Sequence, residues 1–197
     1  MSISLTEQED SLFSFLLQTL EENGRSTVIR VAGGWVRDKL LGKESNDIDI
    51  ALDDMMGKDF AEMINDKINN LRIAQDGNYQ PRNRVRVIKA NAEKSKNIEV
   101  AMIKVQGIML DITNLRNAEY TIGTPLEDAM MRDVTINSLF FNVNESKVED
   151  FTGKGFSDLM AGRIQTPSDP VWTFKDDAVR LLRAIRFSSR FQFEIDP

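Results

Sequence analysis

The chain has 197 residues, of which 41% are hydrophobic and 28% charged, and its formal net charge is −6. These values are typical of a folded globular domain and argue against a disordered or fibrous chain. The chain contains no cysteine and no histidine, which excludes disulfides, thiolate or His-ligated zinc sites and a Ser/His catalytic triad. Any bound metal should therefore be a hard cation held by carboxylates.

The sequence shows no apolar run of signal-peptide length and none that approaches the ~20 residues of a membrane span. We therefore expect an intracellular, soluble protein with no membrane partner. The acidic net charge argues weakly against a broad nucleic-acid surface, because phosphate contacts need an excess of Lys and Arg.

The start of the chain predicts a helix followed by a strand. Thr6 and Glu9 have capping-box spacing ahead of an apolar stripe with a 3.6-residue period, and Gly24 should end this helix. Residues 28–31 then predict a short strand.

The Gly33-Gly34 pair ends that strand, and a short helix is expected over residues 35–41. Ile48, Ile50 and Leu52 alternate with Asp47 and Asp49, which is the period of a strand. A helical apolar stripe begins again at Phe60.

Residues 75–97 are polar and rich in Lys and Arg, and they predict a mobile basic excursion with a short strand over residues 85–88. Two strands, over residues 98–105 and 108–115, follow it. Gly107 between them is a hairpin signal.

A further helix is expected after Gly123, carrying Met130, Met131, Val134 and Ile136. Residues 138–143 and 147–151 predict another hairpin. Asp169-Pro170 precedes the last predicted helix. The apolar stripe of that helix consists of Ala178, Leu181, Leu182 and Ile185.

Three carboxylates are candidates for a metal site. Asp47 and Asp49 lie two residues apart on a strand, so their side chains share a face with Cα atoms roughly 6 to 7 Å apart. Two like charges this close favour a bound cation, although ordinary strand alternation is the alternative. Asp111 faces away from the apolar side of its own strand and could be a third carboxylate, or simply a solvated one. Such a cluster suits two Mg²⁺ ions in phosphoryl-type transfer.

The Gly33-Gly34 turn between a strand and a helix could hold phosphate oxygens with its backbone amides. An ordinary turn is the alternative reading. The spacing Gly-x-Gly-x-x-Gly of a dinucleotide-binding fold is absent.

Residues 33–38 (Gly-Gly-Trp-Val-Arg-Asp) and 46–49 (Asn-Asp-Ile-Asp) together closely resemble the signature of the class II CCA-adding enzymes and bacterial-type poly(A) polymerases. The resemblance continues through residues 132–139, 150–164 and 176–180, so it runs from about residue 28 to the C-terminus. The Trp in the glycine motif and the long basic excursion look most like the fungal and plant type. In this family the counterpart of the excursion can close over the nucleotide as a lid.

The resemblance implies roles for two groups of residues. Asp47 and Asp49 would hold the metals and, with Asp111, form the catalytic carboxylates, while Gly33, Gly34 and Arg37 would support the triphosphate.

Arg132 and Asp133 match the part of the family motif that contacts the ribose 2′-hydroxyl. The family usually has Arg-Arg-Asp there, and Met131 replaces the first arginine. This replacement either removes a cation near the nucleotide or marks a position that faces the core.

Asp177 and Arg180 lie three residues apart on the last predicted helix, and the family resemblance makes them the pair that selects the base. Cytosine and adenine present an amino donor beside a ring-nitrogen acceptor, which a carboxylate and a guanidinium match, whereas uracil and guanine leave polar groups unpaired. A surface ion pair is the alternative. Arg183, Arg186 and Arg190 extend the polar side and could contact RNA phosphates.

We therefore expect an α+β fold: a polymerase-β-like nucleotidyltransferase head with a mixed, largely antiparallel sheet and flanking helices over residues 1–166. Residues 167–197 should begin an all-α neck. The expected activity is addition of C and A from CTP and ATP to the tRNA 3′ end, with Mg²⁺ and release of pyrophosphate; no DNA partner is expected. Alternatives are a poly(A) polymerase, an enzyme that adds only part of CCA, or a catalytically weak nucleotide-binding fragment that lacks the tRNA-binding body. The expected compartment is cytoplasmic, with mitochondria or nucleus as alternatives in a eukaryote.

Overall fold

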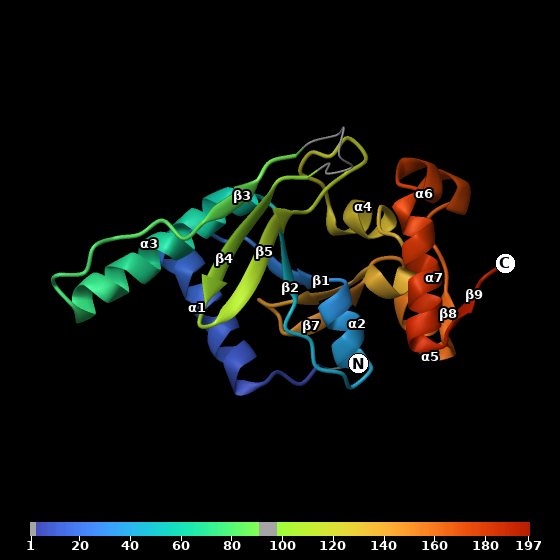
Figure 1. The fold of residues 1–197 in the computed structure, drawn as a ribbon, viewed down its shortest axis with the longest axis horizontal. Helices are drawn as coiled ribbons and strands as arrows, with labels where there is room; N and C mark the ends of the chain where they lie inside the picture. Colours follow the sequence, from blue (N-terminus) through green and yellow to red (C-terminus); the bar gives the residue numbers. More distant parts are fainter. Residues whose placement is uncertain (1–2, 91–97) are drawn as a thin grey trace.

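The computed structural model describes residues 3–90 and 98–197 and contains one mixed sheet with flanking helices (Figure 1). Its strands are β1 (Ile29–Ala32), β2 (Ile48–Leu52), β3 (Arg86–Ile88), β4 (Val100–Val105), β5 (Ile108–Asn114), β6 (Leu139–Asn142) and β7 (Lys147–Asp150). They are ordered β3-β4-β5-β2-β1-β6-β7. Strands β2 and β5 are parallel, and the other neighbouring pairs are antiparallel. The predicted fold class is confirmed.

Two groups of helices flank this sheet. The helices are α1 (Glu7–Glu22), α2 (Gly34–Leu40), α3 (Gly57–Gln75), α4 (Pro125–Met130), α5 (Gly155–Ala161), α6 (Pro170–Asp176) and α7 (Val179–Phe191). Helices α1 and α3 pass behind β4 and β5 in Figure 1, whereas α4 to α7 gather at the other end of the sheet. A small parallel pair, β8 (Arg163–Ile164) and β9 (Glu194–Ile195), lies beside α7. No helix in the described ranges is long and apolar enough to cross a membrane.

The alternation predicted for β2 determines which face of the sheet carries the candidate catalytic carboxylate Asp49. Ile48, Ile50 and Leu52 are fully buried, and they join the main core with side chains from α1 and α3. Because successive side chains of a strand point to opposite faces, Asp49 lies on the face turned away from that core.

Helix α1 is tied to α2 through one buried carboxylate. The predicted capping box is present, with the Thr6 side chain accepting from the Glu9 amide and the Glu9 carboxylate accepting from the Thr6 amide. The same carboxylate accepts from Trp35 Nε1 at 3.0 Å and pairs with Lys39 Nζ at 2.9 Å. Burial alone would raise the pKa of Glu9, but these hydrogen bonds outweigh it and lower the pKa. This carboxylate anchors the helix that follows the glycine turn.

The helix predicted after Gly123 is shorter than expected. Helix α4 ends at Met130, and Val134 is extended with φ −141° before a 3₁₀ turn over Thr135–Asn137. The Thr135 amide donates to the Gln165 carbonyl instead of continuing the helix. The β-branched run from Val134 to Ile136 also disfavours a helix.

The last predicted helix is two helices, and its apolar stripe was assigned wrongly. Leu181, Leu182 and Ile185 are 47%, 67% and 50% exposed, and Ala178 precedes α7 and is also exposed. The residues of α7 that are buried are Arg180, Ala184 and Phe187. Helix α7 therefore turns a mixed, arginine-bearing face toward the sheet.

The basic excursion, predicted to be mobile, contacts α3 over part of its length. The Asn69 side chain accepts from the Arg82 amide and donates to the Arg82 carbonyl, and Asn65 accepts from the Arg84 amide. The predicted strand appears as β3. The rest of the predicted excursion, residues 91–97, lies outside the described residues.

The close approach of α3 to β5 predicts a stability effect at Gly57. A Cβ atom on Gly57 would lie 2.1 Å from the Ile112 carbonyl oxygen. Gly57→Ala should therefore lower the free energy of unfolding by about 3 kcal/mol, measured by urea unfolding followed by circular dichroism. Gly77→Ala is the matched control, because no atom lies within 4 Å of its added methyl. Equal unfolding midpoints for the two variants would contradict this packing.

Candidate active site

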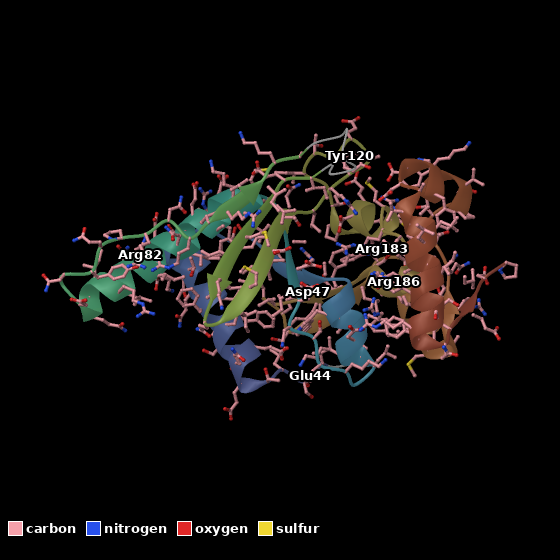
Figure 2. All side chains as sticks on the ribbon, in the orientation of Figure 1. Glu44, Asp47, Arg82, Tyr120, Arg183 and Arg186 are labelled. Atoms are coloured by element: carbon pink, nitrogen blue, oxygen red, sulfur yellow. The ribbon has the colours of Figure 1, made fainter. Side chains whose placement is uncertain are left out.

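An open cleft of about 610 Å³ lies between the ends of β1 and β2 and helix α7. Nine of the ten site residues predicted from the sequence line this cleft. They are Gly33, Gly34, Arg37, Asp47, Asp49, Arg132, Asp133, Asp177 and Arg180. Asp111 is not among the lining residues. Figure 2 shows Asp47 near the middle of the molecule, with Arg183 and Arg186 of α7 beside it.

Charges of both signs line this cleft in almost equal number. Seven arginines line it: Arg37, Arg116, Arg132, Arg180, Arg183, Arg186 and Arg190. Six carboxylates face them: Asp38, Glu44, Asp47, Asp49, Asp133 and Asp177. The net acidity of the chain therefore does not extend to the walls of this cleft.

Asp47 and Asp49 form the acidic floor of the cleft. Both are solvent-accessible, and neither forms a hydrogen bond or ion pair with the described part of the chain. Asp49 is reached by solvent from the cleft but is enclosed by protein on its other sides. This desolvation, with repulsion from Asp47 and Asp111 that Arg132 only partly offsets, raises the pKa of Asp49 to about 6. A divalent cation would relieve that repulsion, so the pair fits a metal site.

Asp111 lies beside this floor. The parallel register places Asp111 opposite Asp49, on the same face of the sheet, as the strand patterns predicted. Burial and repulsion from Asp47 raise the pKa of Asp111. Within residues 3–90 and 98–197, however, no group of three carboxylates is arranged to hold a metal ion. A ligand role for Asp111 therefore stays a prediction.

The glycine turn has a backbone that only glycine adopts easily. Gly33 has φ 69° and ψ −116°, and its amide donates to the Leu139 carbonyl at 3.0 Å. A Cβ atom there would lie 3.1 Å from Arg132 Nη1 and 3.3 Å from the Asn137 carbonyl oxygen. The turn is thus pressed against the segment that carries Arg132.

Arg37 is buried, and its guanidinium is occupied by protein partners. It donates to Asp38 Oδ1 at 2.8 Å and to the Asn137 side chain, and it lies over the rings of Phe187 and Phe191. Desolvation lowers its pKa despite Asp38. The structure therefore places Arg37 as a link between α2 and α7 at the edge of the cleft.

Arg132 is fixed by a carboxylate and an aromatic ring. Its Nε and Nη2 atoms donate to Asp128 Oδ2 at 3.1 and 2.6 Å, and its guanidinium lies over the Phe140 ring. Asp128 also pairs with Arg116, at 3.2 Å. Two arginines therefore share one buried carboxylate.

Asp133 connects the sheet end of the cleft to α7. Its Oδ1 accepts from the Val134 amide and from Asn137 Nδ2, and its Oδ2 accepts from Arg183 Nε at 2.6 Å. These contacts fix the orientation of the carboxylate at the cleft wall.

Arg180 pairs with a residue other than the predicted one. Its Nη2 atom lies 2.6 Å from Asp176 Oδ2, and the residue is 7% exposed. Asp177 instead caps the start of α7 by accepting from the Val179 amide. The alternative of a surface ion pair between Asp177 and Arg180 is therefore wrong, although both residues line the cleft. Tyr120 reaches across and donates to Asp176 at 2.8 Å.

Asn137 and Arg116 are among the lining residues to which the sequence analysis gave no role. Asn137 lies within the motif of residues 132–139, so its position in that motif was an available signal. The sequence held no such signal for Arg116. This residue follows β5 in a loop, and only the fold brings it to Asp128.

Residues 29–165 match the family described as the Poly A polymerase head domain. The chain belongs to this family. Met131, which replaces the usual first arginine of the family motif, is 3% exposed and faces the interior. The interpretation of this position as core-facing is therefore confirmed.

Similar proteins point to one branch of the family. The chain is 42% identical to the mitochondrial CCA tRNA nucleotidyltransferase of Saccharomyces cerevisiae, over 99% of its own length and 38% of that protein. Its fold matches a Thermotoga maritima CCA-adding enzyme complexed with tRNA, with a TM-score of 0.71 and 28% identity over 98% of this chain and 40% of that one. A CCA-adding enzyme in complex with CTP matches with a TM-score of 0.68, 28% identity and the same coverages. The chain therefore spans about two fifths of the length of these proteins.

The raised pKa of Asp49 predicts a pH-dependent stability difference. The folded state keeps a proton on Asp49 up to about pH 6, whereas an unfolded aspartate has lost it by about pH 4. Ionisation of Asp49 therefore destabilises the fold as the pH rises through this window. Without divalent cations, Asp49→Asn should melt at a higher temperature than the wild type at pH 7.5, and the difference should vanish near pH 4.

The measurement is thermal unfolding with a chelator present, from pH 4 to pH 7.5. Asp54→Asn, on an exposed turn after β2, is the control and should show no such trend. A pH-independent difference for Asp49→Asn would contradict the electrostatic cause.

Proposed function

We propose that this chain is the catalytic front part of a tRNA nucleotidyltransferase that adds C and A from CTP and ATP to the RNA 3′ end and releases pyrophosphate. The main support is one juxtaposition: the free carboxylates Asp47 and Asp49 share a cleft with the glycine turn and with Asp177 and Arg180. The names of the yeast relative and of the two solved structures described above agree with this reaction.

Enzymes of this family generally use divalent metal ions, and we propose Mg²⁺, with two ions held by Asp47 and Asp49. Hard cations prefer oxygen ligands, and these two carboxylates have no competing partner in the described chain. When bound, such ions would lower the pKa of the attacking hydroxyl and neutralise charge on the triphosphate. We propose that Asp111 acts with them as a third catalytic carboxylate.

The remaining cleft residues would hold the nucleotide. At the glycine turn the Gly34 amide would donate to phosphate oxygens, because the Gly33 amide already donates to the Leu139 carbonyl, and Arg37 would keep α2 in place behind that turn. Arg132 and Asp133 would contact the ribose, in orientations fixed by Asp128 and by Arg183.

Asp177 and Arg180 would select the base. A carboxylate acceptor beside a guanidinium donor matches the amino group and ring nitrogen of C or A and mismatches U or G. The Asp176 ion pair, supported by Tyr120, would hold Arg180 in the reading position. We further propose that residues 167–197 begin the neck of a longer enzyme. The compartment is proposed to be intracellular, with a mitochondrial location suggested by the yeast relative.

Removal of a floor carboxylate should abolish transfer. With tRNA lacking its terminal CCA, Mg²⁺ and labelled CTP or ATP, Asp49→Ala should lower the rate on the order of 1,000-fold, since several kcal/mol of charge stabilisation would be lost. Asp54→Ala, outside the cleft, is the matched control and should keep the wild-type rate. Full activity of Asp49→Ala would overturn the metal assignment. Product length with ATP alone, compared with both nucleotides, distinguishes CCA addition from poly(A) synthesis.

Substitution of the base-reading arginine should relax selectivity and leave the charge unchanged. Arg180→Lys should lower the preference for CTP and ATP over UTP and GTP by about tenfold or more, because a mismatched polar group costs about 1–3 kcal/mol. The measurement is kcat/KM for each of the four nucleotides. Arg190→Lys, at the opposite end of the same cleft, should preserve the preference. An equal fall in kcat/KM for all four nucleotides in Arg180→Lys would contradict base reading.

A further inference from the structure

The sheet has an uncovered face beside the acidic floor. Strands β3, β4 and β5 are backed by α1 and α3, and no helix in the described chain covers their other side (Figure 1). Four side chains define this open sheet face: Arg86, Met102, Lys104 and Met109. Arg86 and Lys104 are exposed, Met109 is 47% exposed and Met102 is partly buried.

The strand register leads from the catalytic floor directly onto this face. Asp49 lies opposite Asp111, Asp111 opposite Met102, and Met102 opposite Arg86. Because neighbouring strands are ~4.8 Å apart, Arg86 lies about 14 Å from Asp49 along this row of opposed residues. Lys104 lies opposite Met109 in the adjacent row. Acids thus give way to apolar side chains and then to cations along one continuous surface.

The cations of this face are not balanced by carboxylates. All four residues also line a groove of about 910 Å³ that reaches α1 and α3, where Phe15, Leu71 and Arg72 contribute to its lining, and none of its lining residues is Asp or Glu. Arg86 and Lys104 form no ion pair with carboxylates in the described part of the chain. In a protein of net charge −6, such a local excess of positive charge favours an anionic partner.

We propose that the open sheet face binds the single-stranded 3′ end of the RNA substrate, and this inference rests on the proposed function. The terminal hydroxyl would lie at Asp49, and the phosphates upstream of it would lie over Lys104 and Arg86. Met102 and Met109 offer flexible, polarizable side chains against which bases of any identity can pack. A surface of this kind can bind single-stranded RNA of any base sequence.

An acidic protein segment is the other partner that the charge of this face could accommodate. Continuity with Asp49 favours RNA, because the attacking hydroxyl must reach the carboxylate floor while its chain continues away from it. The opposite direction is occupied by α7 and its arginines, which face the nucleotide side of the cleft.

The test is binding of a fluorescent single-stranded RNA that ends in CC to the 197-residue chain, followed by anisotropy at several salt concentrations. Arg86→Ala/Lys104→Ala should weaken binding about tenfold at low salt. The slope of log affinity against log salt should fall by about 1.4, since each phosphate contact to a single strand contributes about 0.7. Lys58→Ala/Lys154→Ala removes the same charge from exposed positions elsewhere and should leave affinity and slope near the wild-type values.

Nucleotide binding separates this inference from the proposed function. Affinity for labelled CTP should be unchanged in Arg86→Ala/Lys104→Ala. If CTP binds but both double variants bind RNA equally, or the wild type binds no RNA, the open sheet face is not the RNA site and the proposed reaction is unaffected. If RNA binding depends on Arg86 and Lys104 while the chain neither binds CTP nor transfers nucleotides, the surface is supported and the proposed reaction fails.

Discussion

Repulsion between carboxylates at the floor of the cleft is the constraint on which the rest of the site depends. Asp49 lies on the polar face of β2 with Asp47 just before the strand, and the parallel register adds the charge of Asp111 beside Asp49. Desolvation by burial, together with repulsion from Asp47 and Asp111, raises the pKa of Asp49 to about 6. Arg132 and Arg183 partly offset this repulsion without contacting Asp49, which leaves the carboxylates themselves free for a cation.

Two arginines, Arg37 and Arg183, connect the sheet to α7. Arg37 on α2 lies over Phe187 and Phe191, and Arg183 on α7 pairs with Asp133. The walls of the cleft are therefore tied together by cation–π contacts and a charge-assisted hydrogen bond, in addition to the apolar packing of Ala184 and Phe187. Contacts of this kind can re-form in slightly different geometries more readily than close-packed side chains.

Local sequence patterns predicted the features that depend on local rules. The capping box of Thr6 and Glu9 marked α1, and alternation in residues 48–52 marked β2 together with the face that carries Asp49. The family motif then named nine residues that the fold brings to one cleft. Their individual roles stay proposals, since geometry alone does not test them.

Features that depend on tertiary partners could not be predicted. Beyond the end of helix α4 at Met130, the Thr135 amide bonds to the distant Gln165 carbonyl, a partner that no local pattern identifies. Arg180 turned inward to Asp176, and the leucines that resembled a core stripe faced outward, because α7 packs through Ala184 and Phe187. Arg116 reached the site only through its ion pair with Asp128.

The parallel pairing of β2 with β5 also has a consequence for the order of folding. These strands are separated along the chain by α3 and by the β3–β4 segment, so their pairing closes a long loop, which makes it a late contact. The local helices and the β4–β5 hairpin can form before Asp49 and Asp111 meet. Asp49 and Asp111 therefore come close together, with mutual repulsion, only after the surrounding helices and the β4–β5 hairpin can have formed.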